Sequence, residues 1–585
     1  MVQQLSWKVG GQQGEGIEST GEIFSTALNR LGYYLYGYRH FSSRIKGGHT
    51  NNKIRVSKTQ VRSVSDDLDI LVAFDQETID VNVHELRVGG VVIADAKFNP
   101  SLPETCTTAT LYAVPFTEIA TELGTSLMKN MVAVGASSAV LHIDTEVFEE
   151  VVLEIFGKKG QKVVQKNMEA IKKGADYIRE QLGEQLETMK LDPADGKKRM
   201  FMIGNDAIAL GALAGGARFM PAYPITPASE IMEYLIKKLP QFGGTVIQTE
   251  DEIAACTMAI GANYAGVRAL TASAGPGLSL MMESIGLAGI TEQPVVIIDT
   301  QRGGPSTGLP TKQEQSDLMA MIYGTHGEIP KIVMAPSTVE EAFYDTIEAF
   351  NLAEEYQCPV IMLTDLQLSL GKQSVEPLDY NRVEIRRGKL QQGELEELEE
   401  KQYYKRYRVT EDGVSPRVIP GMKHGIHHVT GVEHDETGKP SESPVNRDDQ
   451  MNKRLRKTKG IRFNTPIHVH SHEKESDILF VGFNSTRGVI EEAMERLEQD
   501  GIKVNHAHIR LIHPFPADEL LPYVQGAKKV VVVENNATGQ LANILKMNIA
   551  SHDKIQSVLK YDGNPFLPQE VYAKSKEMFV LNGNV

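Results

Sequence analysis

Side chains able to do chemistry gather on four loops between residues 219 and 317. Thr226 lies between two prolines, in the sequence Tyr-Pro-Ile-Thr-Pro, which fixes the backbone around its hydroxyl. Glu252 ends a run of three acidic residues, and Arg302 is followed by two glycines. A guanidinium offers a planar pair of donors that suits a carboxylate ligand. We therefore predict a small-molecule site at the carboxyl ends of the strands of an α/β sheet.

The apolar segments between these loops alternate in type. Short β-branched runs read as strands, and longer stretches rich in Ala, Ile and Met read as helices. This alternation predicts a parallel sheet. We expect Pro276 to place a turn at Gly275-Pro276-Gly277, where the glycines allow close backbone approach. The expected strands are residues 244–248, 269–272 and 294–299, and the expected helices are residues 252–265 and 279–289.

Each candidate residue also has an ordinary structural explanation. A carboxylate at a helix start, such as Glu252, usually does no more than interact with the helix dipole. Glu250 and Asp251 compete with it for any acidic role. Thr226 or Ser229 could be the N-cap of a helix over residues 230–238.

The stretch that begins at Glu252 resembles the pyrimidine-binding domain of thiamin diphosphate enzymes. In that family a Glu begins an Ala-rich helix, a Gly-Ala step follows, here Gly261-Ala262, and a Gly-Pro-Gly turn comes next. The resemblance implies that Glu252, rather than its acidic neighbours, hydrogen-bonds the aminopyrimidine and promotes formation of the ylide. The cofactor contacts that it implies are Glu252, Tyr223, Pro224, Ile225, Gly275 and Gly277.

The loop Tyr223–Pro227 resembles the substrate loop of 2-oxoacid:ferredoxin oxidoreductases. In that family the Thr contacts the oxoacid, and an Arg further along the chain binds its carboxylate. The resemblance therefore implies that Thr226 and Arg302 bind substrate.

The first 190 residues resemble the gamma-type domain of the same oxidoreductases. A Gly-rich loop, Gly10–Gly16, follows a short strand and opens a helix over residues 17–31. Such a loop can bind phosphate, but a tight turn explains it as well. A nicotinamide dehydrogenase is the alternative, although no acidic residue marks a ribose site and Glu15 would repel a pyrophosphate. The resemblance implies coenzyme A contacts at Gly11, Gly14, Arg44, Lys46 and Gly47.

We predict an α/β protein of several domains. The gamma-type domain covers residues 1–190, the pyrimidine-binding domain residues 199–375, an irregular connection residues 376–475, and a transketolase C-terminal-like domain residues 476–585. The charged segment 158–198 is expected to be a mostly helical linker. The C-terminal domain is expected mainly to pack subunits together.

The composition excludes several classes of protein. A net charge of −15 argues against nucleic acid as the main partner. Three widely spaced cysteines argue against a disulfide framework or a cluster bound by this chain. No apolar run is long enough to span a membrane and the first residues are no signal peptide, so we expect a cytoplasmic protein. We expect no metal site in this chain.

The Gly-Asp-Gly and Asn motif that holds Mg²⁺ and diphosphate is missing, because Tyr561–Asn564 is only superficially similar. The resemblance therefore implies a beta-type partner that carries Mg²⁺, the diphosphate site and a 4Fe-4S cluster, in a heterotetramer of two alpha and two beta subunits. We predict oxidative decarboxylation of 2-oxoglutarate with coenzyme A and ferredoxin. The alternatives are pyruvate or another 2-oxoacid as substrate, a transferase of the transketolase or acetolactate synthase type, and a non-catalytic assembly subunit.

Overall fold

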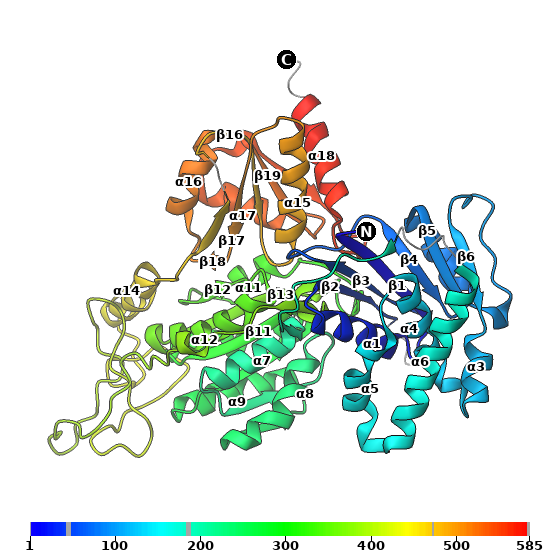
Figure 1. The fold of residues 1–585 in the computed structure, drawn as a ribbon. Helices are drawn as coiled ribbons and strands as arrows, with labels where there is room; N and C mark the ends of the chain where they lie inside the picture. Colours follow the sequence, from blue (N-terminus) through cyan, green and yellow to red (C-terminus); the bar gives the residue numbers. More distant parts are fainter. Residues whose placement is uncertain (1, 43–47, 183–188, 471–472, 582–585) are drawn as a thin grey trace. The chain divides into compact units, whose positions relative to one another are not determined.

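The computed structural model describes residues 2–42, 48–182, 189–470 and 473–581 (Figure 1). The chain forms two compact units that do not follow one another in sequence. The first contains residues 1–202, 370–377 and 567–570, and the second contains residues 203–369, 378–566 and 571–585. Both mix helices with sheets, which confirms the predicted α/β class. No helix in the described ranges is long and apolar enough to cross a membrane.

Among its described residues, the first unit is built on one sheet of eight strands. Its strand order is β6-β5-β4-β1-β3-β2-β14-β7. The central strand β1 runs parallel to β4 and antiparallel to β3. The strands are β1 (Gln4–Gln12), β2 (Tyr34–His40), β3 (His49–Ser57), β4 (Leu68–Ala73), β5 (Leu86–Asp95), β6 (Thr110–Val114), β7 (Met200–Met202) and β14 (Gln373–Val375).

Helices cover the apolar face of this sheet. Trp7 of β1 stacks on Phe24 of α1 (Ile17–Arg30) with ring centroids 4.3 Å apart. The helices α4 (Lys129–Val140) and α6 (Gln161–Leu182) approach so closely that a Cβ on Gly135 would lie 1.8 Å from the Ile171 carbonyl. The segment predicted to be a linker is thus largely a core helix, because the apolar face of α6 packs on α4. Shorter helices of this unit are α2 (Gln76–Asn82), α3 (Phe116–Glu122) and α5 (Glu149–Phe156).

The second unit begins with a parallel arrangement of strands. The sheet β10-β11-β13-β12-β18 is parallel except for β18, and the parallel pair β8-β9 is joined to it by a bridge between Phe219 and Ala269. The strands are β8 (Phe219–Ala222), β9 (Thr245–Gln248), β10 (Leu270–Ser273), β11 (Val295–Gln301), β12 (Ile332–Met334), β13 (Pro359–Asp365) and β18 (Leu511–His513). The helices are α7 (Gly204–Ala214), α8 (Ser229–Lys238), α9 (Glu252–Tyr264), α10 (Gly275–Ile290), α11 (Leu318–Tyr323), α12 (Val339–Tyr356) and α13 (Leu366–Leu370).

A second α/β sheet forms the C-terminal part of the same unit. Its strand order is β15-β17-β16-β19-β20, and β15 alone runs antiparallel. The strands are β15 (Ile467–His470), β16 (Ser476–Gly482), β17 (Val504–Ile509), β19 (Ala527–Glu534) and β20 (Ile555–Leu559). The helices are α15 (Thr486–Gln499), α16 (Ala517–Gly526), α17 (Gln540–Asn548) and α18 (Pro568–Leu581). Because β18 pairs with β12, this part also adds a strand to the first sheet of the unit.

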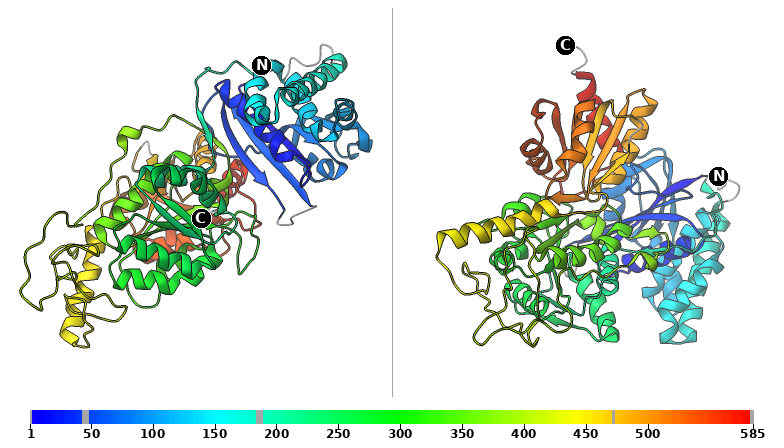
Figure 2. Two further views of the ribbon diagram at one scale, coloured as in Figure 1. Left: turned by 90° about the horizontal axis from the view of Figure 1, so that it is seen from below. Right: turned by 90° about the vertical axis from the view of Figure 1, so that its left-hand side faces the viewer.

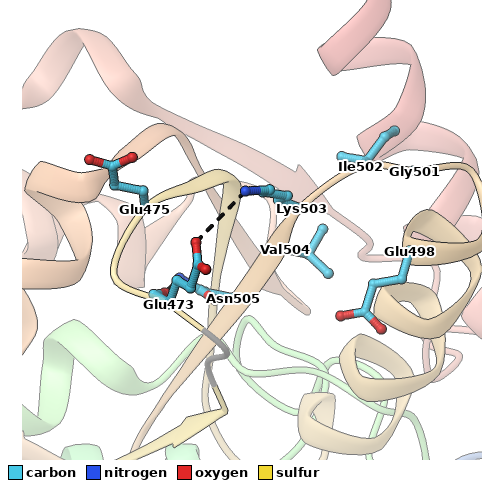
Figure 3. Close-up of a pocket in the computed structure, with 8 residues that line it drawn as sticks. All are labelled: Glu473, Glu475, Glu498, Gly501, Ile502, Lys503, Val504 and Asn505. Atoms are coloured by element: carbon cyan, nitrogen blue, oxygen red, sulfur yellow. Dashed lines mark hydrogen bonds and ion pairs between the residues drawn. The ribbon is translucent and has the colours of Figure 1, made fainter.

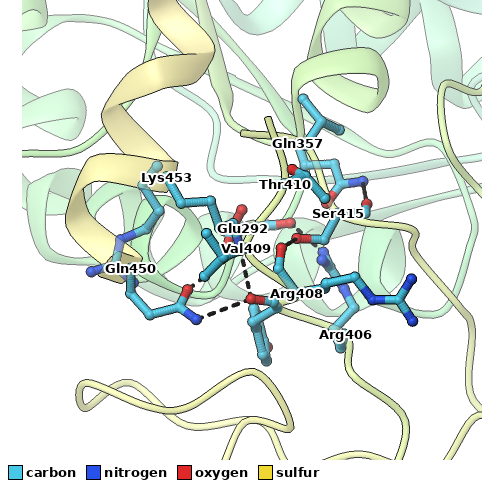
Figure 4. A network of polar contacts seen from close by, with 12 residues as sticks. Glu292, Gln357, Arg406, Arg408, Val409, Thr410, Ser415, Gln450 and Lys453 are labelled. Atoms are coloured by element: carbon cyan, nitrogen blue, oxygen red, sulfur yellow. Dashed lines mark hydrogen bonds and ion pairs between the residues drawn. The ribbon is translucent and has the colours of Figure 1, made fainter. Parts of the chain in front are cut away.

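The connection after residue 378 is irregular as far as one long helix, α14 (Pro444–Gly460), which lies beside the helices of the second unit (Figure 2). Lys453 and Lys457 of α14 both form ion pairs of 2.5 Å with Glu292, and all three side chains are fully buried. Gln450 and Lys453 also donate to the Tyr407 carbonyl (Figure 4). Burial would raise the pKa of Glu292, but the two lysines and Arg406 hold that pKa below its usual range. The irregular segment is therefore anchored through a buried ionic network.

Candidate functional site

The four loops predicted to form the site lie at one edge of the parallel strands of the second unit. The pairing of Ala222 with Gln248 places the loops after β8 and β9 side by side, and Thr249 N donates to the Ala222 carbonyl at 3.0 Å. The pairing of Ser273 with Asp299 does the same for β10 and β11. Because parallel strands end at a common edge, the loops that carry Thr226, Glu252 and Arg302 share that edge.

Glu252 is the first residue of α9 and is only 6% exposed. The cap of this helix is Asp251, whose carboxylate accepts a hydrogen bond from Ala254 N at 2.7 Å. Asp251 thus has a structural role that accounts for its acidity. Among the three neighbouring acidic residues, Glu250 is exposed, Asp251 is half-buried and only Glu252 is buried.

The helix α10 begins at Gly275, so the prediction that Gly275-Pro276-Gly277 forms a turn ahead of the helix was wrong. Proline fits the first helical turn because its missing N–H would have no partner there. Both glycines lie against carboxyl groups. A Cβ on Gly277 would lie 2.7 Å from Glu252 Oε1, and a Cβ on Gly275 would lie 2.6 Å from Asp317 Oδ2.

Arg302 and Thr226 are brought together. The Nη1 group of Arg302 donates to the Thr226 carbonyl at 2.6 Å, and Arg302 is 7% exposed. Burial lowers the pKa of Arg302, and the nearby Asp317 opposes this effect. The predicted N-cap roles of Thr226 and Ser229 were wrong, because α8 is capped at Ala228 without a side-chain hydrogen bond. The hydroxyl of Thr226 therefore does not serve as a helix cap.

The remaining residues of this loop are more open. Tyr223 and Pro224 are exposed, and Ile225 is half-buried. Asn205, which sequence reasoning did not select for this site, donates to the Pro227 carbonyl at 2.6 Å and fixes the end of the loop. The loop thus has a fixed end and an open apolar side.

The sequence analysis did not identify one feature of this region, a pair of buried carboxyl groups on Asp299 and Asp317. Asp299 is fully buried, and neither of its carboxylate oxygens has a hydrogen-bond partner among the described residues. Burial and the charge of Asp317 raise its pKa well above the usual range. Burial and Glu314 raise the pKa of Asp317 to about 6, against the lowering effect of Arg302. The signal in the sequence was an Asp within the apolar strand Val-Val-Ile-Ile-Asp.

The Gly-rich loop of the first unit borders a cavity of about 300 Å³. Gly14 and Gly16, both with positive φ, line it together with Arg39 and Asn51. Gly16 caps α1 without a side-chain hydrogen bond, which leaves N–H groups at the helix start for an anion.

Two details of this loop bear on its charge and its neighbours. Glu15 forms an ion pair of 2.7 Å with Lys129, which offsets the repulsion predicted for a phosphate. Gln13 N donates to the Gly48 carbonyl at 3.2 Å, so Gly48, the residue after the predicted contact Gly47, lies beside this loop. Gly11 lies against Ile17 and Phe74. Arg44, Lys46 and Gly47 lie outside the described residues.

Another cavity, of about 330 Å³, lies in the C-terminal part of the second unit (Figure 3). Glu473, Glu475 and Glu498 line it, with Lys503 3.7 Å from Glu473. Of the predicted site residues that the structure describes, none borders this cavity. Within the described ranges, no three His, Cys, Asp or Glu side chains are grouped so that they could hold a metal ion.

Comparison with known proteins finds relatives along the whole chain. Family models match at residues 6–177 (pyruvate ferredoxin/flavodoxin oxidoreductase), 210–453 (pyruvate flavodoxin/ferredoxin oxidoreductase, thiamine diphosphate-binding) and 476–571 (pyruvate:ferredoxin oxidoreductase core domain II). A 2-oxoacid:ferredoxin oxidoreductase subunit alpha from Sulfolobus is 35% identical over 100% of this chain and 99% of its own length. The 2-oxoglutarate oxidoreductase subunit KorA of Mycobacterium tuberculosis is 32% identical, over 96% of this chain and 89% of its own.

A solved structure is similar over nearly the full length. It is the 2-oxoglutarate:ferredoxin oxidoreductase from Magnetococcus marinus with 2-oxoglutarate, coenzyme A and succinyl-CoA bound. It is 36% identical, has a TM-score of 0.92, and the match covers 99% of this chain and 100% of that one.

Proposed function

The chain belongs to the alpha subunits of the 2-oxoacid:ferredoxin oxidoreductases, and from this premise we propose a specific reaction for it. With a beta-type partner, it oxidatively decarboxylates 2-oxoglutarate in the presence of coenzyme A. The products are succinyl-CoA, CO₂ and reduced ferredoxin. The observation that carries this proposal is the buried Glu252 at the same sheet edge as the Arg302–Thr226 pair.

The position of Glu252 supports a hydrogen bond from this residue to the aminopyrimidine of thiamin diphosphate. It is buried at a helix start, and only a glycine at position 277 leaves room beside its carboxyl group. We propose that Glu252 would hold the flat aminopyrimidine, with Gly275, Gly277 and the loop Tyr223–Ile225 beside it, since glycines allow close backbone approach. Thiamin diphosphate supplies the nucleophilic carbon and the electron sink that decarboxylation requires. Glu252 holds a proton at the ring nitrogen.

Arg302 is the proposed anchor for the 2-oxoacid carboxylate. It is nearly buried, so a charge-assisted hydrogen bond to a carboxylate would be strong there. Its bond to the Thr226 backbone orients the guanidinium and leaves other donors for substrate. The Thr226 hydroxyl lies on the same loop and is proposed to contact the oxoacid.

A beta-type partner is proposed to complete the site. Ile253 and Met258 on α9 and Leu280 on α10 are 45%, 37% and 52% exposed, although both helices start at the site. Exposed apolar side chains beside a functional edge support a protein partner there. The partner would hold Mg²⁺, the diphosphate and the 4Fe-4S cluster, in a heterotetramer of two alpha and two beta subunits.

Two observations support the choice of co-substrates. The relatives include KorA subunits named for 2-oxoglutarate, and the similar solved structure has 2-oxoglutarate and coenzyme A bound. For coenzyme A, we propose the cavity beside Gly14 in the first unit, with Gly11 supporting the loop. Arg44, Lys46 and Gly47 are proposed as further contacts on the family resemblance alone. Pyruvate or a wider range of 2-oxoacids is the alternative substrate.

The test is an assay of the co-purified pair with 2-oxoglutarate, coenzyme A, thiamin diphosphate and a low-potential acceptor, with pyruvate in parallel. We expect acceptor reduction with CO₂ release only in the pair, and none with Glu252→Ala. Normal turnover of Glu252→Ala would instead support a non-catalytic assembly subunit. Carbon–carbon transfer without acceptor reduction would support a transferase. Acetyl-CoA from pyruvate at equal efficiency would support the wider substrate range.

A further inference from the structure

Arg302, the proposed anchor of the substrate, begins a long loop, residues 302–317, that hydrogen bonds hold at its base and in its middle. At its base, Asp317 N donates to Gln301 Oε1 at 3.2 Å. In its middle, Gly303 N donates to the Lys312 carbonyl at 3.1 Å, and Leu309 N donates to the Gly303 carbonyl at 2.8 Å. A displacement of residues 313–317 would therefore also move Arg302, because Lys312 is hydrogen-bonded to Gly303, the residue after Arg302.

The segment 313–317 is held from outside by the turn that follows β19, residues 534–540. Gln315 N donates to the Asn535 carbonyl at 2.7 Å, and Asn535 N donates to Gln315 Oε1 at 2.9 Å. Asn536 Nδ2 donates to the Gln315 carbonyl at 3.1 Å. These groups are buried, so an unmade bond would be costly and the register of the contact is well defined.

Gln540, the first residue of α17, holds the end of the same loop. Its Nε2 donates to the Ser316 carbonyl at 2.7 Å, and its Oε1 accepts from Met319 N at 2.9 Å. One amide side chain thus bonds the backbone on both sides of Asp317. An amide is suited to this because it offers a donor and an acceptor at once.

We propose that the β19–α17 turn of the C-terminal part is a positioning element for the substrate, which acts by holding the loop of Arg302 in place. The inference rests on the proposed role of Arg302. It extends the role expected for this part of the chain from packing to the binding of the oxoacid. Gln540 is the positioning residue that can be tested most cleanly, because it is only half-buried and contacts the loop through its side chain.

The experiment compares Gln540→Ala with Asn548→Ala in the co-purified pair. Asn548 is a matched control: it is an exposed amide on the same helix, and its side chain donates to the Ile544 carbonyl of that helix, away from the turn. Gln540→Ala should raise the KM for the oxoacid about three- to tenfold, the effect of one to two hydrogen bonds. The value of kcat should change less than about twofold, thiamin diphosphate saturation should not change, and hydrogen exchange of residues 302–319 should become faster. Asn548→Ala should change none of these.

The possible outcomes distinguish the positioning role of the turn from the proposed role of Arg302. Faster exchange of the loop without a change in KM, or no change in either, would overturn the positioning role. If thiamin diphosphate affinity falls by the same factor by which the KM for the oxoacid rises, the positioning role is also overturned. The substitution would then disturb the whole site and not the oxoacid alone. If Gln540→Ala does not fold, Gln540→Met keeps the length of the side chain and removes its polar atoms. If Arg302→Ala leaves the KM for the oxoacid unchanged, the proposed function of Arg302 fails independently.

Discussion

Gly277 and Glu252 lie in contact across the start of two neighbouring helices, α10 and α9. The Cα of Gly277 is so close to the carboxyl group that an added methyl group would lie 2.7 Å from Glu252 Oε1 and 2.1 Å from Ser273 Oγ. The glycine therefore fixes where the carboxyl of Glu252 can lie, and the two residues form one functional unit.

Gly277→Ala should displace the Glu252 carboxyl and reduce kcat by about tenfold to 100-fold, because small misplacements of a reacting group are costly. The measurement is steady-state turnover of the pair. The matched control for the helix is Gly286→Ala, at which an added Cβ meets nothing within 4 Å. It should leave the Tm of the isolated chain unchanged or raise it. Full turnover of Gly277→Ala would contradict the arrangement.

Arg302→Ala should lower kcat/KM for the oxoacid by about 100-fold or more, because it removes a charged anchor from a nearly buried position. Arg302→Lys keeps the charge and loses the planar fork, so we expect an intermediate loss. Saturation with thiamin diphosphate should be unaffected in both. An unchanged kcat/KM in Arg302→Ala would refute the anchor.

Asp317→Asn should stabilise the chain more at pH 7.5 than at pH 4. The pKa of Asp317 is raised to about 6 in the folded chain, from 3.8 without burial. The folded state thus holds this proton more tightly, and stability is lost as the pH rises from about 4 through 6. The substitution removes that loss. The measurement is Tm at both pH values, with the exposed Asp553→Asn as control. An equal gain at both pH values would contradict the assignment.

Glu292→Ala should lower the free energy of unfolding by about 3–5 kcal/mol, because it leaves Lys453 and Lys457 buried without their counter-ion. Chemical denaturation of the isolated chain measures this. Glu283→Ala serves as control, since its carboxylate is mostly exposed and should matter by less than about 0.5 kcal/mol. Replacing Glu292 and Lys453 together by Met should recover part of the loss.

Arg44→Ala with Lys46→Ala should raise the KM for coenzyme A several-fold and leave the KM for the oxoacid unchanged, if the Gly-rich loop region binds its phosphates. Lys158→Ala, an exposed charge of the first unit, is the control. A rise in both KM values would assign these residues to another role.

The parallel arrangement of the second unit was predictable because its strands are short, apolar and followed directly by glycine, proline and polar residues. The residue at which α10 begins could not be predicted. Proline usually ends a helix or strand, but it also fits the first turn of a helix, as Pro276 does here. The burial of Glu252 and the proximity of Arg302 to Thr226 are structural facts, whereas the roles of these residues stay predictions.

Long-range partners explain most of what the sequence did not reveal. In α14, Lys453 and Lys457 look like solvated charges until Glu292, far earlier in the chain, is placed against them. The sequence of α6 contains so many charged residues that we predicted a linker, although one face of the helix is apolar and includes Ile171 and Ile178. The apolar run before Asp299 indicates a buried strand, but the raised pKa of its carboxyl also depends on Asp317, which lies on a later loop that the sequence does not place beside it.

The first unit is completed by strands that the ribosome makes at very different times. β7 pairs with β14, and β14 pairs with β2, yet the whole segment 203–369 is synthesised between β7 and β14. The edge of β2 therefore stays unpaired until residue 373 has been synthesised. An unpaired strand edge can form hydrogen bonds with the strands of other chains. The order of translation thus makes the early sheet dependent on a later segment, and slow synthesis between residues 203 and 373 should favour aggregation of the nascent chain.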